Sequence, residues 1–312
     1  MKKDRGIGAW LAYVAFRVVA ALFHLTPINV NLRVARGLAA GWARLSPRHL
    51  RRAEEHLTLA FGESLSVDDR RRIALACLEH WTMFAVELIR APGLINRYTW
   101  HRYLVPVNLE ETLRHLLTGQ GAILLTGHFG NWELVGHLIA CFGFPVAAVM
   151  RPLDNVYLND YLVRTRATHG LALLDKRGAT AQAEDLLRRG RLVGFIADQD
   201  AGRKGIFVDF FGRPASTYKS IGLLAMQTRV PVIVGYARRI GEGFRYEVAV
   251  QRIIRPQEWE AQDDPLRWIT QTYTREIETA ARQNPPQYLW IHRRWKSQPT
   301  DRPNAPRPGP PA

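Results

Sequence analysis

ILLTGHFGNWEL, residues 123–134, decides how the fold of this chain is predicted. Residues 122–126 are apolar apart from a closing threonine and are bounded by glycines, which is typical of a buried strand. Residues 132–142 have the apolar spacing of a helix, and Asn131 is of a residue type favoured at a helix N-cap. The stretch therefore predicts a strand, a tight turn and a helix in direct succession.

The predicted turn contains a histidine, and the predicted helix carries a carboxylate in its first turn. On one helix, His128 and Glu133 would point about 140° apart, whereas a strand-turn-helix unit lets them approach each other. Ligands of open α/β sheets bind beyond the carboxyl ends of the strands. Two interpretations stay open: a base that is held by a carboxylate and activates a hydroxyl, or a strand-end histidine satisfied by backbone groups.

Strand and helix patterns alternate along the rest of the chain around this unit. Further strands are expected at residues 145–150, 171–175, 191–197, 205–211, 231–239 and 244–254. Further helices are expected at residues 109–117, 156–167, 180–189, 220–228 and 265–282. This alternation predicts an α/β fold with a mixed, largely parallel central sheet and helices on both faces.

The residues before this alternating part have the pattern of helices, and the residues after it have a composition typical of disorder. Residues 30–61 predict helix that Pro47 interrupts, and Ser66 opens a long amphipathic helix over residues 66–92. The Pro-rich stretch at residues 300–312 predicts a disordered tail.

The N-terminal segment at residues 7–25 is nearly all apolar and about as long as a bilayer core requires. Trp10 and Tyr13 suit a membrane interface, and Arg17 is costly in lipid unless it reaches the surface. The segment predicts a membrane-associated helix that spans the bilayer or lies in its inner leaflet, with a buried core helix as the alternative. The arginine-rich chain that follows favours a cytoplasmic body by the positive-inside rule.

The composition of the chain limits the kinds of binding partner that are expected. The chain has 312 residues, is 47% apolar and has a formal net charge of +15 from 43 basic and 28 acidic side chains. Arginines occur throughout, which suits phosphorylated lipid, a membrane surface, an acidic carrier protein or nucleic acid. Cys77 and Cys141 lie in apolar helical patterns and predict buried thiols in a reducing compartment.

Further polar segments end predicted strands or precede a helix, so they are expected at the same rim of the sheet as the histidine. The side chains that they bring there are Arg151, Asp198, Asp200 and Lys219. Arg151 and Asp198 can form a structural salt bridge with each other or contact a ligand. Asp198 and Asp200 lack the further ligands of a metal site, so no metal is expected.

Five segments, in this order, resemble the bacterial lipid A biosynthesis acyltransferases, the lauroyl and myristoyl transferases that add secondary acyl chains. They also resemble wider relatives, including phosphatidylinositol mannoside acyltransferases. The segments are HFGNWE, a version of the family's His-x4-Asp/Glu box, then MRPLDN, ADQDAG, VDFFGRPA and PQYLWIHRRWK, within residues 7–297. The Pro-Glu-Gly-Thr-Arg box of glycerol-phosphate acyltransferases is absent from the sequence, which counts against glycerolipid synthesis.

The resemblance implies a sheet wrapped by helices, an anchor helix at residues 1–25 and an acyltransferase domain at residues 26–299. It implies an acyl-carrier-protein or acyl-CoA thioester as donor, but its motifs do not fix the acceptor class. We expect membrane lipids including a phosphorylated glycolipid acceptor as partners, and no cofactor. With the positive-inside rule, the expected place is the bacterial inner membrane with the catalytic body on the cytoplasmic side. The resemblance also carries over His128 as general base and Glu133 as its partner.

This chemistry assigns further expected roles. His128 takes the proton of the acceptor hydroxyl as its oxygen attacks the thioester, and Glu133 fixes the tautomer. The oxyanion is stabilised by backbone N–H groups near Gly130 and Asn131, or by Arg151. The substrate-binding candidates are Arg151, Asp198, Asp200, Arg164, Arg166 and Lys219, and for the last three plain solvated charges are the alternative.

We therefore predict a membrane-associated acyltransferase that acts on a hydroxyl of a lipid A precursor or related glycolipid. The alternatives are another envelope lipid acceptor, such as a phosphatidylinositol mannoside or ornithine-type lipid, and a non-enzymatic lipid-binding or nucleic-acid-binding protein. The basic residues 292–296 with Trp290 and Trp295 suit either membrane headgroups or nucleic acid. Dispersed charge and the lipophilic N-terminus favour lipid, so no nucleic-acid partner is expected.

Overall fold

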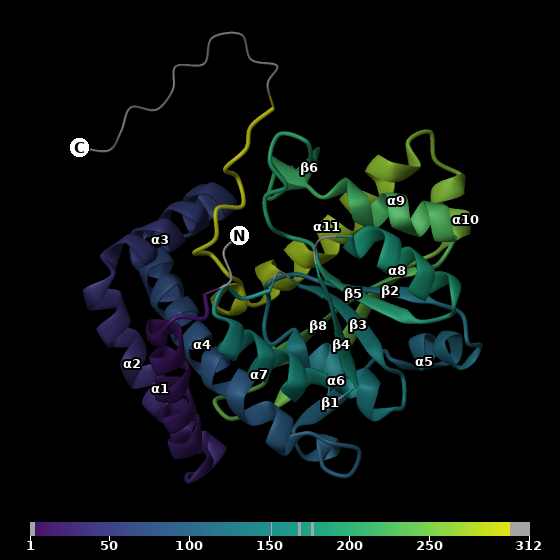
Figure 1. Ribbon diagram of the computed structural model, residues 1–312. Helices are drawn as coiled ribbons and strands as arrows, with labels where there is room; N and C mark the ends of the chain where they lie inside the picture. Colours follow the sequence, from purple (N-terminus) through teal and green to yellow (C-terminus); the bar gives the residue numbers. More distant parts are fainter. Residues whose placement is uncertain (1–3, 151, 168–169, 176–177, 300–312) are drawn as a thin grey trace.

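The computed structural model describes residues 4–150, 152–167, 170–175 and 178–299. Its centre is a seven-stranded sheet with strand order β1-β9-β8-β2-β5-β3-β4 (Figure 1). The strands are β1 (Leu104–Val107), β2 (Ala122–Thr126), β3 (Val146–Met150), β4 (Leu171–Asp175), β5 (Leu192–Ile196), β8 (Val232–Arg239) and β9 (Tyr246–Ile254). All neighbours are parallel except β8 and β9. The predicted mixed, largely parallel sheet is confirmed, and β1 is a strand that was not predicted.

Helices cover both faces of this sheet, as expected (Figure 1). The covering helices are α5 (Glu110–Leu117), α6 (Glu133–Cys141), α8 (Ala179–Arg188), α9 (Lys219–Thr228) and α11 (Pro265–Gln283). The side chains of β2 divide between the two faces. Ile123 and Leu125 belong to an apolar cluster with α8, α9 and α11, whereas Leu124 belongs to one with α5 and α6. A strand with two covered faces is apolar throughout, which is why β2 has no polar alternation.

The register between β2 and β5 brings two turns together that are distant in sequence. The two strands are parallel, with Thr126 opposite Ile196. The residue two places beyond Thr126 is His128, and the residue two places beyond Ile196 is Asp198. Because parallel strands leave the sheet at the same edge, this pairing sets His128 and Asp198 side by side.

The segment at residues 213–217 corrects one expectation. The polar segment RPASTYKS, residues 213–220, was expected at the rim of the parallel sheet, just before a helix. Its first five residues instead form β7 (Arg213–Thr217), which pairs antiparallel with β6 (Ile206–Phe210) in a separate two-stranded sheet. The connecting residues, Phe211 and Gly212, both have positive φ, of 57° and 70°. Two such residues make the tight turn that suits the twist of a hairpin, so the chain turns back instead of extending along the rim.

In the described part of the chain, four α-helices precede the sheet, and the predicted breaks between them are confirmed. They are α1 (Ile7–His24), α2 (Ile28–Leu45), α3 (Pro47–Phe61) and α4 (Val67–Leu94). Pro47 occupies the first position of α3, where a missing N–H costs nothing. Ser66 caps α4, because its hydroxyl accepts a hydrogen bond from the Asp69 N–H at 3.1 Å.

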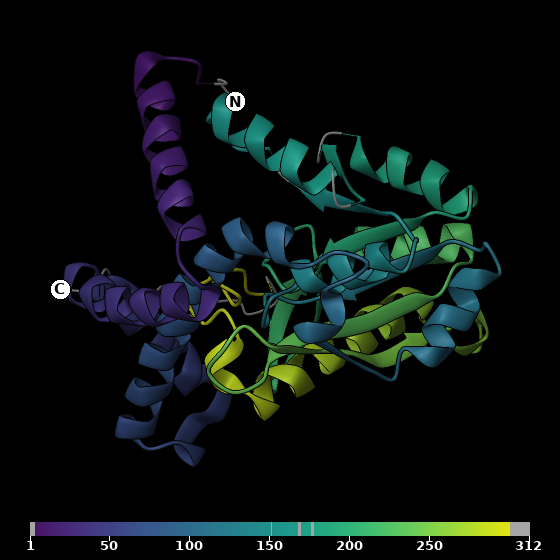
Figure 2. The ribbon, with the colours of Figure 1, turned by 90° about the horizontal axis from the view of Figure 1, so that it is seen from below.

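Among the described residues, α1 is the one helix long and apolar enough to cross a membrane. Only 11% of its apolar window is buried, which excludes the alternative of a buried core helix. Figure 2 shows α1, in purple, extending along the edge of the molecule. It contacts α7 (Val156–Ala167), where Tyr13 stacks on Tyr157 and Phe16 packs edge-on against Tyr161.

The segment after α11 corrects the expectation for the Trp-rich C-terminal motif. Trp290, Arg294 and Trp295 are buried rather than presented to headgroups or bases. The reason is that Arg294 has hydrogen-bond partners inside the protein. Its guanidinium donates to the Ser216 carbonyl at 2.6 Å and to the Thr217 hydroxyl at 2.7 Å. The motif therefore ties the chain end to β7.

Candidate active site

The turn between β2 and α6 depends on close backbone contacts. Gly130 has a φ of 57°, and a Cβ added to it would lie 1.9 Å from the Ala237 carbonyl oxygen. Only glycine fits such an approach. The Gly130 N–H donates to the Gln287 carbonyl at 3.0 Å, and the Asn131 N–H donates to the Ala237 carbonyl at 2.8 Å. The turn is thus hydrogen-bonded to β8 and to the C-terminal segment.

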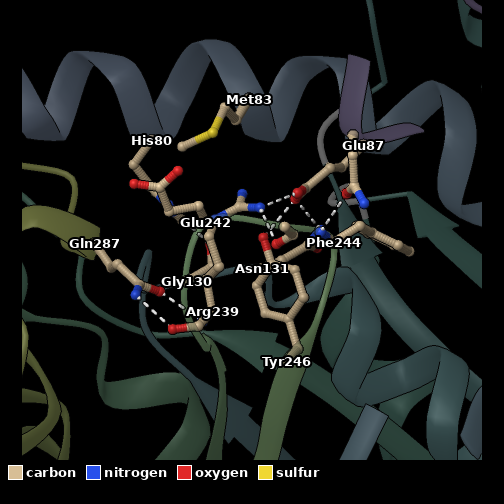
Figure 3. Close-up of polar contacts among 12 residues, drawn as sticks. His80, Met83, Glu87, Gly130, Asn131, Arg239, Glu242, Phe244, Tyr246 and Gln287 are labelled. Carbon is tan, nitrogen blue, oxygen red and sulfur yellow. Dashed lines mark hydrogen bonds and ion pairs between the residues drawn. The ribbon is translucent and has the colours of Figure 1, made fainter. Parts of the chain in front are cut away.

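Asn131 does not cap α6 as expected, because its side chain belongs to a buried polar network (Figure 3). Its amide donates to the Glu87 carboxylate at 2.9 Å, and the same carboxylate accepts the Tyr246 hydroxyl. Arg239 completes the network with a 2.6 Å ion pair to Glu87. Gln287 bonds both backbone groups of Arg239, so α4, β8, β9 and the turn are held together.

His128 contacts Asp198 rather than Glu133, which corrects the expected pairing. The His128 Nδ1 lies 2.6 Å from one Asp198 carboxylate oxygen, and the His128 backbone N–H donates to the other at 2.8 Å. The Asp198 side chain is 1% exposed and that of His128 is 13% exposed. A carboxylate only accepts hydrogen bonds, so the proton of a neutral His128 sits on Nδ1 and the Nε2 lone pair faces outward.

The charge state of this pair follows from its surroundings. Burial by itself raises the pKa of Asp198, but the charge and hydrogen bonds of His128 outweigh burial and hold that pKa well below its usual range. His292 lies behind the pair, with its Nε2 3.1 Å from the Asp198 carbonyl oxygen. Burial lowers the pKa of His292 to about 4. Asp198 is therefore an anion and His292 is neutral at physiological pH.

Glu133 forms a separate ion pair with Arg166 of α7. The Arg166 Nε donates to one carboxylate oxygen at 2.9 Å and its Nη2 donates to the other. Both side chains are largely buried, at 14% exposed for Glu133 and 11% for Arg166. A guanidinium matches both oxygens of a carboxylate at once. Glu133 is the first residue of α6, and its carboxylate connects that helix to α7 through Arg166.

The Glu133–Arg166 pair borders an apolar cavity of about 260 Å³. The cavity lies between the sheet and α6, with a wall of aliphatic and aromatic side chains that includes Leu124, Trp132, Ile139, Val146, Phe195 and Ile233. The Trp132 ring also packs edge-on against His128, with 5.0 Å between ring centroids. A single tryptophan thus connects the apolar cavity with the imidazole.

The other predicted substrate-binding residues have different positions. Asp200 accepts hydrogen bonds from the Ser297 backbone and hydroxyl, at 3.1 and 3.0 Å, so its carboxylate braces the C-terminal segment. Arg164 and Lys219 are exposed, Arg164 on α7 and Lys219 at the start of α9. Arg151, expected to pair with Asp198, lies outside the described residues.

Two further residues near His128 were not predicted, and a signal in the sequence could have found one of them. Gln199 places its side-chain amide 3.3 Å from the His128 Nε2, and His292 contacts the Asp198 carbonyl. Gln199 directly follows Asp198 at the end of β5, where a parallel neighbour of β2 has to deliver its side chains to the same rim. His292, in contrast, is brought by a segment whose path no local pattern predicts.

These features together define a class of protein. A buried carboxylate orients a histidine whose free nitrogen can accept a proton from a hydroxyl, and an apolar cavity lies on the other side of Trp132, whose ring packs against that histidine. This combination fits an enzyme that transfers acyl groups.

Comparison with known proteins identifies the family. Residues 2–297 match the family described as bacterial lipid A biosynthesis acyltransferase, and the chain belongs to that family. The lipid A biosynthesis lauroyltransferase of Escherichia coli K12 is 26% identical over 295 residues, covering 93% of this chain and 92% of that protein. The phosphatidylinositol mannoside acyltransferase of Mycobacterium tuberculosis H37Rv is 27% identical over 55% of this chain and 56% of its own length. The palmitoleoyltransferase of lipid A biosynthesis of E. coli K12 is 27% identical over 61% of each chain.

The chain is accordingly an acyltransferase of the lipid A biosynthesis family, as predicted. Enzymes of this family use acyl donors and lipid acceptors and are membrane-associated. The exposed apolar helix α1 is consistent with that association.

Proposed function

We propose that this enzyme transfers a fatty acyl chain from a thioester donor to a hydroxyl of a lipid A precursor or related glycolipid. His128 acts as general base, and Asp198 takes the partner role that was first expected of Glu133. The observation that carries the proposal is the 2.6 Å contact between the His128 Nδ1 and the buried Asp198 carboxylate. A carboxylate in this position fixes the tautomer and stabilises the imidazolium that forms during the reaction.

The reaction proceeds by direct transfer. The acceptor hydroxyl gives its proton to the His128 Nε2 while its oxygen forms a bond to the thioester carbon. The electron pair of the carbonyl moves onto its oxygen, which becomes the oxyanion of a tetrahedral intermediate. When the intermediate collapses, the C–S bond breaks and the thiolate leaves with the proton that His128 holds. The products are an ester and a free thiol, and His128 returns to its neutral form.

The apolar cavity suits the acyl chain. Its wall is aliphatic and aromatic, so a hydrocarbon chain buried there gains about 0.8 kcal/mol for each methylene group. Glu133 and Arg166 border the cavity, and their charges neutralise each other, so they close its edge without leaving an unpaired charge beside the chain. In this proposal both residues shape the acyl site, and neither takes part in proton transfer.

The acceptor and donor are proposed from chemistry and from relatives. Arg164 and Lys219 are exposed cations that suit the phosphates of a lipid A precursor. The resemblance to a phosphatidylinositol mannoside acyltransferase supports a second acceptor class, a mannosylated phospholipid. The donor is an acyl carrier protein thioester or acyl-CoA, and both fit the basic surface that the net charge of +15 implies.

The enzyme is proposed to act at the inner membrane with its catalytic body on the cytoplasmic side. In this division, residues 1–25 are the anchor and residues 26–299 the acyltransferase domain. The apolar exposed face of α1 supports the anchor, and the arginine-rich helices α2 and α3 support the orientation. The proposed tail at residues 300–312 lies outside the described residues.

The test is a transfer assay with the detergent-solubilised full chain, acyl-carrier-protein thioester and a panel of acceptors, read by mass spectrometry. A gain of one acyl chain is expected on a lipid A precursor and not on glycerol phosphate. His128→Ala should reduce turnover by about 10²–10⁴-fold. His101→Ala is the matched control, because His101 is an exposed histidine remote from β2 in sequence. Equal turnover of the wild type and His128→Ala would refute the base assignment.

A further inference from the structure

We propose that Gln199 is a catalytic residue whose side-chain amide donates a hydrogen bond to the oxyanion of the tetrahedral intermediate. This inference rests on the proposed function. The Gln199 Nε2 lies 3.3 Å from the His128 Nε2, the nitrogen that faces outward and receives the acceptor proton. Gln199 is exposed. Among the residues that the structure describes, its amide is the side-chain donor in hydrogen-bond contact with this nitrogen.

The backbone around Gln199 is fixed on both sides, so its side chain starts from a defined position. Before it, the Asp198 carboxylate holds His128. After it, the Asp200 carboxylate accepts two hydrogen bonds from Ser297. The Gln199 carbonyl itself accepts a hydrogen bond from buried Arg294 at 3.4 Å. A donor on a restrained backbone loses little freedom when it binds a developing charge, which is what an oxyanion site requires.

The backbone donors that were expected to form the oxyanion site have other partners. The Gly130 N–H donates to the Gln287 carbonyl at 3.0 Å, and the Asn131 N–H donates to the Ala237 carbonyl at 2.8 Å. Using either amide on an oxyanion would break a hydrogen bond that holds the turn. These two amides are therefore already engaged in the turn. Arg151, the other donor expected at the oxyanion, lies outside the described residues and stays a prediction. Among the described side chains, we assign the role to the Gln199 amide.

The geometry of the reaction permits this role. In the resting enzyme, an N–H of Gln199 points at the His128 Nε2 lone pair. The acceptor hydroxyl has to displace it, because the same lone pair must take the proton. The oxyanion then forms on the former carbonyl oxygen, which is attached to the carbon that bonds to the acceptor oxygen. It therefore lies close to the place where the amide rested. Gln199 thus exchanges a hydrogen bond to a neutral nitrogen for a stronger one to an anion.

The test compares Gln199→Ala and Gln199→Glu with wild type in the transfer assay, over a range of pH. Both variants should lower kcat by about 10²-fold at the pH plateau, with little change in KM for donor or acceptor. Gln199→Glu should be no better than Gln199→Ala, because an ionised carboxylate cannot donate and repels the oxyanion. Gln120→Ala is the matched control, since Gln120 is an exposed glutamine before β2 and should retain wild-type kinetics.

Three results would overturn the inference. A higher kcat in Gln199→Ala would mean that the amide only covers the base. A shift of the acidic limb of the pH profile with an unchanged plateau would mean that it only tunes His128. A wild-type plateau and profile would mean that it has no role. Failure of the proposed function would look different, because wild type itself would then transfer no acyl chain or His128→Ala would retain transfer.

Discussion

Two acidic side chains near the carboxyl end of β2, Asp198 and Glu133, pair with different kinds of basic group. Asp198 is 1% exposed and holds an imidazole, whereas Glu133 is 14% exposed and holds a guanidinium. An imidazole gains and loses a proton near neutral pH, whereas a guanidinium stays charged. The partner therefore decides the role: the Asp198 region is built for proton transfer, and the Glu133 region for closing an apolar cavity.

Removing the charge of Asp198 should have the largest effect. Asp198→Asn should lower kcat by about 10²–10⁴-fold, because an amide can hold His128 in the wrong tautomer and does not stabilise the imidazolium. The measurement is steady-state transfer together with a melting curve. In the same assay, the double variant His128→Ala/Asp198→Asn should be no slower than His128→Ala alone. Additive losses would show that the two residues do not work as a unit.

Deleting residues 1–25 should affect the Glu133 region and leave the Asp198 region unchanged. Transfer to an acceptor in vesicles should fall by about tenfold or more, since the enzyme loses its local concentration at the membrane. Transfer to detergent-dispersed acceptor should fall less. Because α1 packs on α7, which carries Arg166, the residual change in detergent should appear in the donor KM rather than in the pH profile. If the truncated protein still sedimented with membranes after a high-salt wash, the membrane anchor would lie in another part of the chain.

Glu133→Gln should have a smaller effect, of a different kind. It removes the carboxylate charge that Arg166 binds at the edge of the apolar cavity, which should cost about 1–3 kcal/mol of stability and raise the KM for long-chain donors by about tenfold. The preference among donor chain lengths should change, while the pH dependence of kcat should stay that of wild type. Glu184→Gln is the matched control, because half-buried Glu184 pairs with exposed Arg188 on α8, away from the cavity lining. A kcat loss as large as that of Asp198→Asn would return Glu133 to the proton-transfer step.

The smallest expected effect concerns pH and the turn between the two regions. Burial lowers the pKa of His80, whose Nε2 lies 3.1 Å from the Gly130 carbonyl, to about 3. The unfolded chain therefore binds a proton at His80 between about pH 6.5 and that value, while the native protein does not, so stability falls as pH decreases through this range. His80→Gln should reduce the loss in melting temperature between pH 7 and pH 4. An unchanged pH dependence in the variant would refute this assignment.

The sequence predicted most of the helices and strands, but it predicted few of the contacts between them. The strand at 122–126, the capped helix after Ser66 and the apolar N-terminal helix were predicted because each depends on local spacing and composition. The first strand of the hairpin at residues 206–217 was predicted, but the second strand at residues 213–217 was not, because its polar residues before a helix suit a loop as well as a strand. The buried position of Trp295 was also missed, since an amphipathic Trp-Arg motif suits a surface as well as a core.

For the site, the sequence by itself determined that His128 stands at the end of a buried strand and that Glu133 opens the following helix. Both placements follow from a change of apolar period within twelve residues, which acts locally. Only the tertiary structure decided which carboxylate meets the imidazole. That choice depends on the pairing of β2 with β5, which brings together His128 and Asp198 although they lie seventy residues apart in the sequence. It also depends on the docking of α7, which brings Arg166 to Glu133. Register and helix docking are set by burial across the whole core, which is why spacing along the chain cannot supply them.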